Sequence, residues 1–252
     1  MSKQKQTTNS ITLQTCNIIS WEPKIADDIS RKIQEKRKEI TSMNFPLIVS
    51  IVGIPGSGKT TSATSLSEIL ASNHNISNII LPMDGYHYPI STLQQFPNSK
   101  DAIYRRGAPD TFDSKSLYND LHTIISNDQE IVSIPGFDHA KGDPEPNKYI
   151  FDRNKHDVII CEGLYLLLLD DHNNNENRWY KNMKSMFDYS VFINADIEKC
   201  LSRVKERNKC IPGYTPDEIE VRVDNVDRKN ALLVQKCQAY ADIVVQSFQC
   251  NM

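Results

Sequence analysis

The chain has 252 residues, a formal net charge of −3 and 39% hydrophobic residues, which indicates one globular domain or one domain with short attachments. The slight net acidity argues against a nucleic-acid partner, and no apolar run approaches the roughly 18 residues of a membrane span. The six cysteines show neither CxxC nor zinc-finger spacing, so we expect reduced thiols and a cytoplasmic location.

Residues 1–20 are expected to form a disordered polar tail. This stretch contains Lys3 and Lys5, but no acidic residue, no arginine and no apolar segment typical of a secretory signal. Residues 21–252 show no internal repeat and no second core, and are expected to form a single domain. That domain opens with a predicted helix over 23–41, whose isoleucines follow one face.

The strongest motif follows the first predicted strand, 47–52, and precedes a predicted helix over 60–71. It fits the pattern GxxxxGK[ST] and consists of Gly53, Ile54, Pro55, Gly56, Ser57, Gly58, Lys59, Thr60 and Thr61. Glycines let backbone N–H groups approach a ligand closely, and a strand–loop–helix order points them at phosphate. We therefore predict that Lys59 contacts the β- and γ-phosphates of ATP and that the Thr60 hydroxyl ligates Mg²⁺.

Strands and helices alternate through the rest of the chain. Strands are predicted at 78–83, 131–134, 157–162, 188–194 and 242–245, and helices at 114–125, 197–208 and 215–239. The polar stretch 171–177 is predicted to be a surface loop. This alternation predicts an α/β fold with a doubly wound, mostly parallel sheet and helices on both faces.

Two acids lie at the carboxyl ends of predicted strands, which is the edge where such sheets bind ligands. They are Asp84 and Glu162. Phosphoryl transfer needs one carboxylate near Mg²⁺ and another that orients the attacking hydroxyl and accepts its proton. Asp84 and Glu162 can divide these roles, and the alternative is that either only caps a turn.

Five further segments carry a family resemblance: MDGYH at 83–87, RRGAPDTFD at 105–113, PGFDH with GDP within 135–144, CEGLYLLL at 161–168, and NVDRKN at 225–230. Together with the glycine-rich loop, in this order and spacing, they resemble the uridine kinase, phosphoribulokinase and pantothenate kinase family of P-loop kinases. The nearest likeness is to fungal ATP-dependent kinases of unassigned substrate. The resemblance covers nearly everything but the tail and implies a P-loop kinase fold with a helical lid.

The resemblance also implies roles for individual residues. Asp84 would be the catalytic base, and Glu162 a Walker B-type acid at the metal. The candidate residues for an acceptor pocket are Tyr86, His87, Arg105, Arg106, Asp110, Phe137, Asp138 and His139. The histidine that uridine kinases carry shortly after the aromatic–Asp pair is replaced here by Gly142–Pro144, and the pantothenate kinase pattern is absent, so a sugar, a nucleoside and a vitamin precursor all stay open.

Arg203 and Arg207 lie four positions apart in a predicted helix and therefore share one face. Guanidinium groups suit the charge on a transferring phosphoryl group, so both are predicted to be catalytic, on a lid whose turn is 209–216. The alternative is an amphipathic helix with a charged outer face.

The sequence thus predicts an ATP- and Mg²⁺-dependent kinase that phosphorylates a hydroxyl of a small molecule. The competing hypothesis is a P-loop nucleotide hydrolase or switch that acts as a regulatory or assembly factor. No nucleic-acid or membrane partner is expected, and a homo-oligomer stays open.

Overall fold

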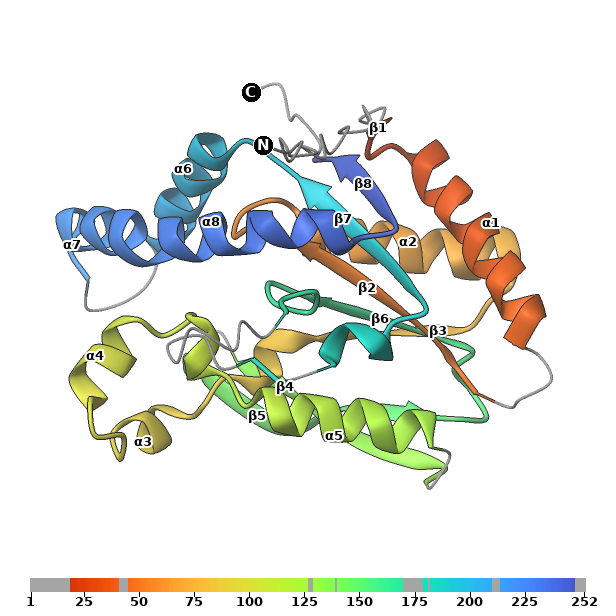
Figure 1. The fold of residues 1–252 in the computed structure, drawn as a ribbon, viewed down its shortest axis with the longest axis horizontal. Helices are drawn as coiled ribbons and strands as arrows, with labels where there is room; N and C mark the ends of the chain where they lie inside the picture. Colours follow the sequence, from red (N-terminus) through yellow and green to blue (C-terminus); the bar gives the residue numbers. More distant parts are fainter. Residues whose placement is uncertain are drawn as a thin grey trace, which may run out of the picture.

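A six-stranded sheet in which every neighbouring pair is parallel forms the centre of the structure (Figure 1). The strand order is β1–β8–β7–β2–β6–β3. The strands are Ile19–Ser20 (β1), Leu47–Gly53 (β2), Asn78–Pro82 (β3), Val158–Gly163 (β6), Tyr189–Asn194 (β7) and Ile243–Gln246 (β8). The computed structural model describes residues 19–40, 45–126, 129–138, 140–169, 179–180, 182–209 and 214–247. The predicted loop at 171–177, His139 and residues 1–18 lie outside these ranges, whereas Ile19–Ser20, assigned to the tail, form β1.

The register of the central strands brings three ligand-binding segments to one edge of the sheet. Both Ile51 in β2 and Pro82 in β3 pair with Glu162 in β6. The carboxyl ends of these three strands therefore lie side by side. This arrangement places the glycine-rich loop after β2, Asp84 after β3 and Glu162 near the end of β6 at the same edge.

The strand side chains alternate between two apolar cores, one on each face of the sheet. One face packs on α1 (Pro23–Ile40) and α2 (Lys59–His74). The other face packs on α5 (Ser114–Ile125) and α8 (Arg228–Lys236). Continuous burial along β2 and β6 is typical of parallel strands covered on both faces, and the predicted doubly wound fold is confirmed.

A two-stranded antiparallel ribbon lies beside α5 (Figure 1) and departs from the sequence prediction. The predicted strand at 131–134 extends over Ile131–Asp138 (β4), and an unpredicted strand, Asp143–Asp152 (β5), pairs with it. The sequence of β5 (DPEPNKYIFD) contains two prolines and mostly polar residues, and most of its residues are exposed or half-buried. It therefore lacks the apolar pattern by which a buried strand is predicted. Prolines are tolerated in such a ribbon since one side of each strand has no partner.

The helices after β7 differ from the single helix predicted over 215–239. Helix α6 (Ile197–Asn208) is followed by α7 (Pro216–Arg222), a π-helical turn over Val223–Asp227, α8 and a 3₁₀ turn over Cys237–Tyr240. A capping box, in which Thr215 and Glu218 satisfy each other's backbone N–H groups, starts α7. Two short helices, α3 (Ile90–Leu93) and α4 (Ser99–Tyr104), precede α5. Within the described ranges, no helix combines the length and the apolar character needed to cross a membrane.

Candidate active site

The glycine-rich loop forms a cradle at the start of α2. Its last glycine, Gly58, has φ +91° and precedes the helix without any side-chain cap. Gly56 has φ +78°, and a Cβ there would lie 2.5 Å from the carbonyl oxygen of Cys200 in α6. Only glycine fits such a position. The first-turn N–H groups of α2 are therefore left for an external acceptor, and the uncapped helix start fits a phosphate group.

A cluster of charged and hydroxyl groups lies beside this cradle. The Lys59 ammonium donates to the Ile54 carbonyl oxygen at 3.1 Å, and the Thr60 hydroxyl donates to Glu162 Oε1 at 3.0 Å. Burial lowers the pKa of Lys59, and the carboxylates of Glu162 and Asp84 oppose this effect. Burial raises the pKa of Glu162, and the Lys59 ammonium opposes that shift. The cluster is held together by opposite charges in a poorly solvated site.

The Thr60–Glu162 pair suits a Mg²⁺ ion that is shared with a phosphate ligand. Among the described residues, no group of three or more His, Cys, Asp or Glu side chains could hold a metal ion. Mg²⁺ usually keeps several waters and needs only one or two protein carboxylates in addition to substrate phosphates. One hydroxyl and one carboxylate next to a phosphate cradle therefore fit this ion.

These groups open into a cavity of about 420 Å³. Its walls include Lys59, Thr60, Asp84, Glu162 and Arg207, and they continue with His87, Arg106, Arg222, Asp227 and Asn230. The cavity thus joins residues from the carboxyl ends of three strands to residues from α7 and α8. Its size is that of a small-ligand site, and its polar groups converge from several elements.

The structure places two of the predicted acceptor residues, His87 and Arg106, in this cavity. His87 donates through Nδ1 to the Asp84 carbonyl oxygen at 2.8 Å, since a carbonyl can only accept, and its ring lies 5.0 Å from the Phe137 ring. Arg106 donates to the Asp143 carboxylate at 2.6 Å and to the Tyr88 carbonyl at 3.0 Å. Its guanidinium lies 5.6 Å from the Phe137 ring centroid. Phe137 therefore supports both side chains from β4.

Two other predicted acceptor residues, Tyr86 and Asp138, form their hydrogen bonds outside this cavity. Tyr86 is buried, and its hydroxyl donates to Asp120 Oδ2 in α5 at 2.8 Å. Asp138 Oδ1 accepts hydrogen bonds from the N–H groups of Ala140 (2.9 Å) and Lys141 (3.1 Å) in the turn of the β4–β5 ribbon. Neither side chain lines the 420 Å³ cavity. His139 falls outside the described residues.

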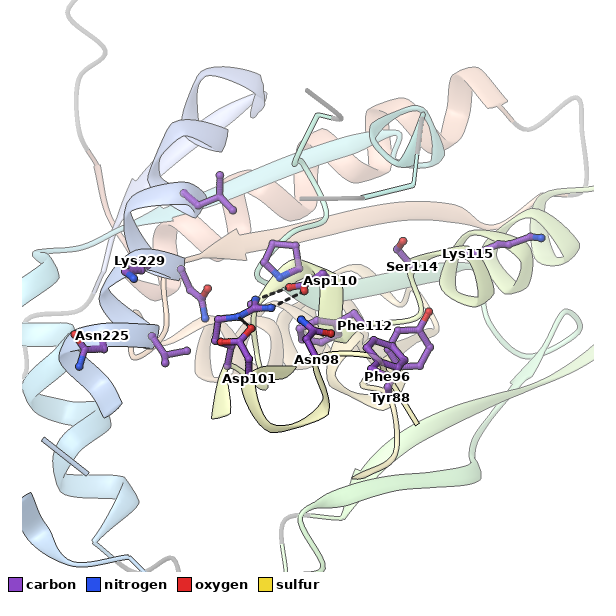
Figure 2. A pocket seen from close by; sticks show the side chains of 16 residues that line it. Tyr88, Phe96, Asn98, Asp101, Asp110, Phe112, Ser114, Lys115, Asn225 and Lys229 are labelled. Atoms are coloured by element: carbon purple, nitrogen blue, oxygen red, sulfur yellow. Dashed lines mark hydrogen bonds and ion pairs between the residues drawn. The ribbon is translucent and has the colours of Figure 1, made fainter. Parts of the chain in front are cut away.

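Arg105 and Asp110 lie in a second cavity, of about 880 Å³, between α4 and α8. The two guanidinium Nη atoms of Arg105 each donate to a carboxylate oxygen of Asp110 at 2.9 Å, and Nε donates to Asp101 at 2.7 Å. Figure 2 shows Asp110 in the middle of the cavity, with Phe112 and the edge-to-face rings of Tyr88 and Phe96 to one side. Arg105 and Asp110 satisfy each other's hydrogen bonds and line a different cavity from Asp84. Their position therefore does not support the predicted role in acceptor binding.

The two arginines of α6 are separated by one helical turn. Arg207 lines the 420 Å³ cavity and helps to lower the pKa of Lys59. Arg203 does not line it, and its Nη1 donates to the Gly56 carbonyl oxygen at 3.3 Å. Of the pair, Arg207 lines this cavity and Arg203 contacts the glycine-rich loop, and the catalytic role of each stays a prediction.

Three further cavity residues, Arg222, Asp227 and Asn230, were not among the predicted site residues. Asn230 donates to the Gly107 carbonyl oxygen at 3.1 Å, and the buried Tyr165 hydroxyl donates to the same oxygen at 2.7 Å. Arg222 Nη1 donates to Asp227 at 3.4 Å. Burial raises the pKa of Asp227, and Arg222 and Arg207 oppose this shift. The only sequence signal was the NVDRKN segment, which gave no indication that Asp227 faces a cavity.

The parallel sheet, the loop at the start of α2 and the acids beside it define a P-loop kinase. A model of the phosphoribulokinase / uridine kinase family matches residues 48–252, and the chain belongs to this family. Relatives and solved structures agree with this. Protein C227.14 of Schizosaccharomyces pombe, described provisionally as a uridine kinase, is 29% identical over 229 residues, which cover 89% of this chain and 94% of that protein.

A second fungal kinase and a bacterial kinase structure are also similar to this chain. The ATP-dependent kinase YFH7 of Lachancea thermotolerans is 26% identical over 228 residues, covering 77% of this chain and 64% of that protein. A crystal structure from Silicibacter sp. TM1040, described provisionally as a kinase of a fructose transport system, superposes with a TM-score of 0.72 and 25% identity. That superposition covers 87% of this chain and 98% of the other. The resemblance to fungal ATP-dependent kinases is thereby confirmed, and family membership implies the use of ATP.

Proposed function

We propose that the protein transfers the γ-phosphoryl group of ATP, with Mg²⁺, to a hydroxyl group of a small molecule. One observation carries this proposal: a single cavity contains a phosphate cradle, a carboxylate–hydroxyl pair for Mg²⁺, and the further carboxylate of Asp84. Each part matches a requirement of phosphoryl transfer, which depends on positioning and on charge stabilisation.

In this proposal the residues divide the work by position. The N–H groups at the start of α2 and the Lys59 ammonium bind the phosphates of ATP. Thr60 and Glu162 hold Mg²⁺, which would neutralise phosphate charge when bound. Arg207 donates to the phosphoryl group as it moves. Asp84 orients the acceptor hydroxyl and accepts its proton.

The extent of the cavity favours a kinase over a nucleotide hydrolase. Beyond Asp84 the walls continue with His87, Arg106, Arg222 and Asp227. A hydrolase needs room only for a water molecule, whereas these groups provide several hydrogen-bonding partners for a larger acceptor.

The test is to incubate the protein with Mg²⁺, ATP labelled on its γ-phosphate and a pool of small metabolites. We expect label in a new phosphate monoester that is not formed by the Lys59→Ala variant. Release of labelled inorganic phosphate alone, at the same rate with and without the pool, would refute the kinase function and favour the hydrolase.

A further inference from the structure

The part of the cavity wall that is not contributed by the phosphate loop, β6 or α6 has its own charge pattern. We define the acceptor wall as Asp84, His87, Arg106, Arg222, Asp227 and Asn230. These residues come from the turn after β3, from the segment after α4, from α7, from the π-helical turn and from α8. The inference below rests on the proposed kinase function and concerns the chemistry of the acceptor.

The π-helical turn between α7 and α8 brings three of these side chains onto one face. A π-bulge inserts one residue into an α-helix. Arg222 and Asp227 are five positions apart, yet across the bulge they lie as residues i and i+4 do, and they form an ion pair of 3.4 Å. Asn230, three positions further, extends the same face. In an uninterrupted α-helix, Asp227 would point away from Arg222. The bulge therefore creates the wall.

Each guanidinium of the acceptor wall already has a carboxylate partner and a backbone partner. Arg106 pairs with Asp143 at 2.6 Å and donates to the Tyr88 carbonyl. Arg222 pairs with Asp227 and donates to the Arg106 carbonyl at 2.9 Å. When Asp143, which lies outside the wall, is counted with Arg106, the two ion pairs cancel in charge and the Asp84 carboxylate remains as one excess negative charge.

Two other cations line the cavity. Lys59 lies in the phosphate loop, and Arg207 in α6 acts on the pKa of both Lys59 and Asp227. On the acceptor wall itself, a phosphate or carboxylate of the acceptor would meet two carboxylates, and both guanidinium groups there already have carboxylate partners. Burying a charge without compensation is expensive. Hydroxyl groups face no such cost, because they can donate to a carboxylate and accept from an amide or guanidinium.

We propose that the acceptor is an uncharged polyhydroxylated molecule, and that Asp227 selects it by accepting a hydrogen bond from a second hydroxyl, away from the one that is phosphorylated. Asp227 is largely buried, and within the described residues its one ion-pair partner is Arg222, at a long 3.4 Å. The carboxylate therefore keeps capacity to accept from a ligand. Arg222 and Asn230 supply the complementary donors.

The first test uses the wild-type protein with Mg-ATP and two defined panels. One panel contains uncharged sugars, polyols and nucleosides, and the other contains sugar phosphates and hydroxy acids. We expect a phosphorylated product from the uncharged panel, detected by mass spectrometry. A product formed only from the anionic panel would overturn this inference and leave the kinase function standing. Nucleotide hydrolysis with no product from either panel would refute the kinase function, and this inference with it.

The second test compares Asp227→Asn with the matched variant Asp224→Asn on the same helix. Asp224 pairs with Lys205 and Arg228 and does not line the cavity. We expect Asp227→Asn to raise the KM for the uncharged acceptor about ten-fold or more, with KM for ATP and kcat nearly unchanged, since a charged acceptor oxygen is replaced by the weaker oxygen of a neutral amide. Asp224→Asn should change none of the three. Equal effects of the two variants, or an unchanged acceptor KM in Asp227→Asn, would overturn the role of Asp227.

Discussion

Gly85 lies where the turn that carries Asp84 meets the β4–β5 ribbon, and replacing it with alanine tests how Asp84, the proposed base, is positioned. A Cβ at Gly85 would lie 2.6 Å from the carbonyl carbon of Pro135 and 3.0 Å from the Cα of Gly136. Both neighbours are backbone atoms and cannot rotate away. To reach the usual carbon–carbon separation of about 3.5–4.0 Å, the two backbone segments must move apart by roughly 1 Å.

This displacement should cost both stability and turnover. Overpacking of this kind typically costs about 1–3 kcal/mol, which urea denaturation would measure. A misplacement of about 1 Å at a reacting group can lower the rate by roughly 10²-fold. We therefore expect Gly85→Ala to lower kcat/KM for the acceptor by that order, with little change in ATP affinity.

Gly142→Ala provides the comparison for the stability measurement. Gly142 has φ +68°, and an added Cβ there meets no atom within 4 Å, so it should show only the cost of left-handed backbone, about 1–2 kcal/mol. If Gly85→Ala has wild-type stability and turnover, the contact between the turn and the ribbon does not fix the position of Asp84, and the prediction is wrong.

Three more predictions follow from the site and its surroundings. Lys59→Ala should abolish phosphoryl transfer while the urea midpoint stays near wild type, and near-normal turnover would show that the loop does not bind the transferred phosphate. Asp84→Asn should lower acceptor phosphorylation by about 10²–10⁴-fold while ATP binding, measured by calorimetry, is retained, and a parallel loss of Mg²⁺ binding would instead identify a metal ligand. Burial raises the pKa of Asp120 above 3.8, so the folded state holds this proton more tightly than the unfolded state does. Relative to Asp120→Asn, the wild type should therefore lose stability as pH rises from 3.8 through the raised pKa, and an unchanged difference in urea titrations across this range would contradict the shift.

Local signals account for the parts of the fold that the sequence predicted well. The apolar runs of β2 and β6 are buried on both faces, so their pattern does not depend on distant details. Helix α5 spans the predicted residues 114–125, and its start is fixed locally because the Asp113 side chain accepts from the Ser116 N–H. The glycine-rich loop is equally local, since its backbone conformation demands glycine.

The missed features depend on tertiary contacts or on a single helical turn. Tyr86 is only two positions after Asp84, but the 3₁₀ turn directs its side chain into the core rather than the cavity. Arg203 and Arg207 share a helix face as predicted, but they lie one turn apart, about 5.4 Å along the axis. Arg203 therefore contacts the glycine-rich loop, whereas Arg207 lines the cavity. The π-helical turn replaces one α-helical register with another, and sequence periodicity does not reveal it.

The pairing at the outer edge of the sheet has a consequence for how the protein folds during synthesis. Ile19 in β1 pairs with Val245 in β8, and β8 itself lies between β1 and β7. Until residues 243–246 have emerged from the ribosome, β8 cannot pair with β7. During that time β7 is an open sheet edge that can pair with other chains. Contacts between segments so distant in sequence also slow folding. β8 is thus the strand that covers the β7 edge and holds β1 in the sheet.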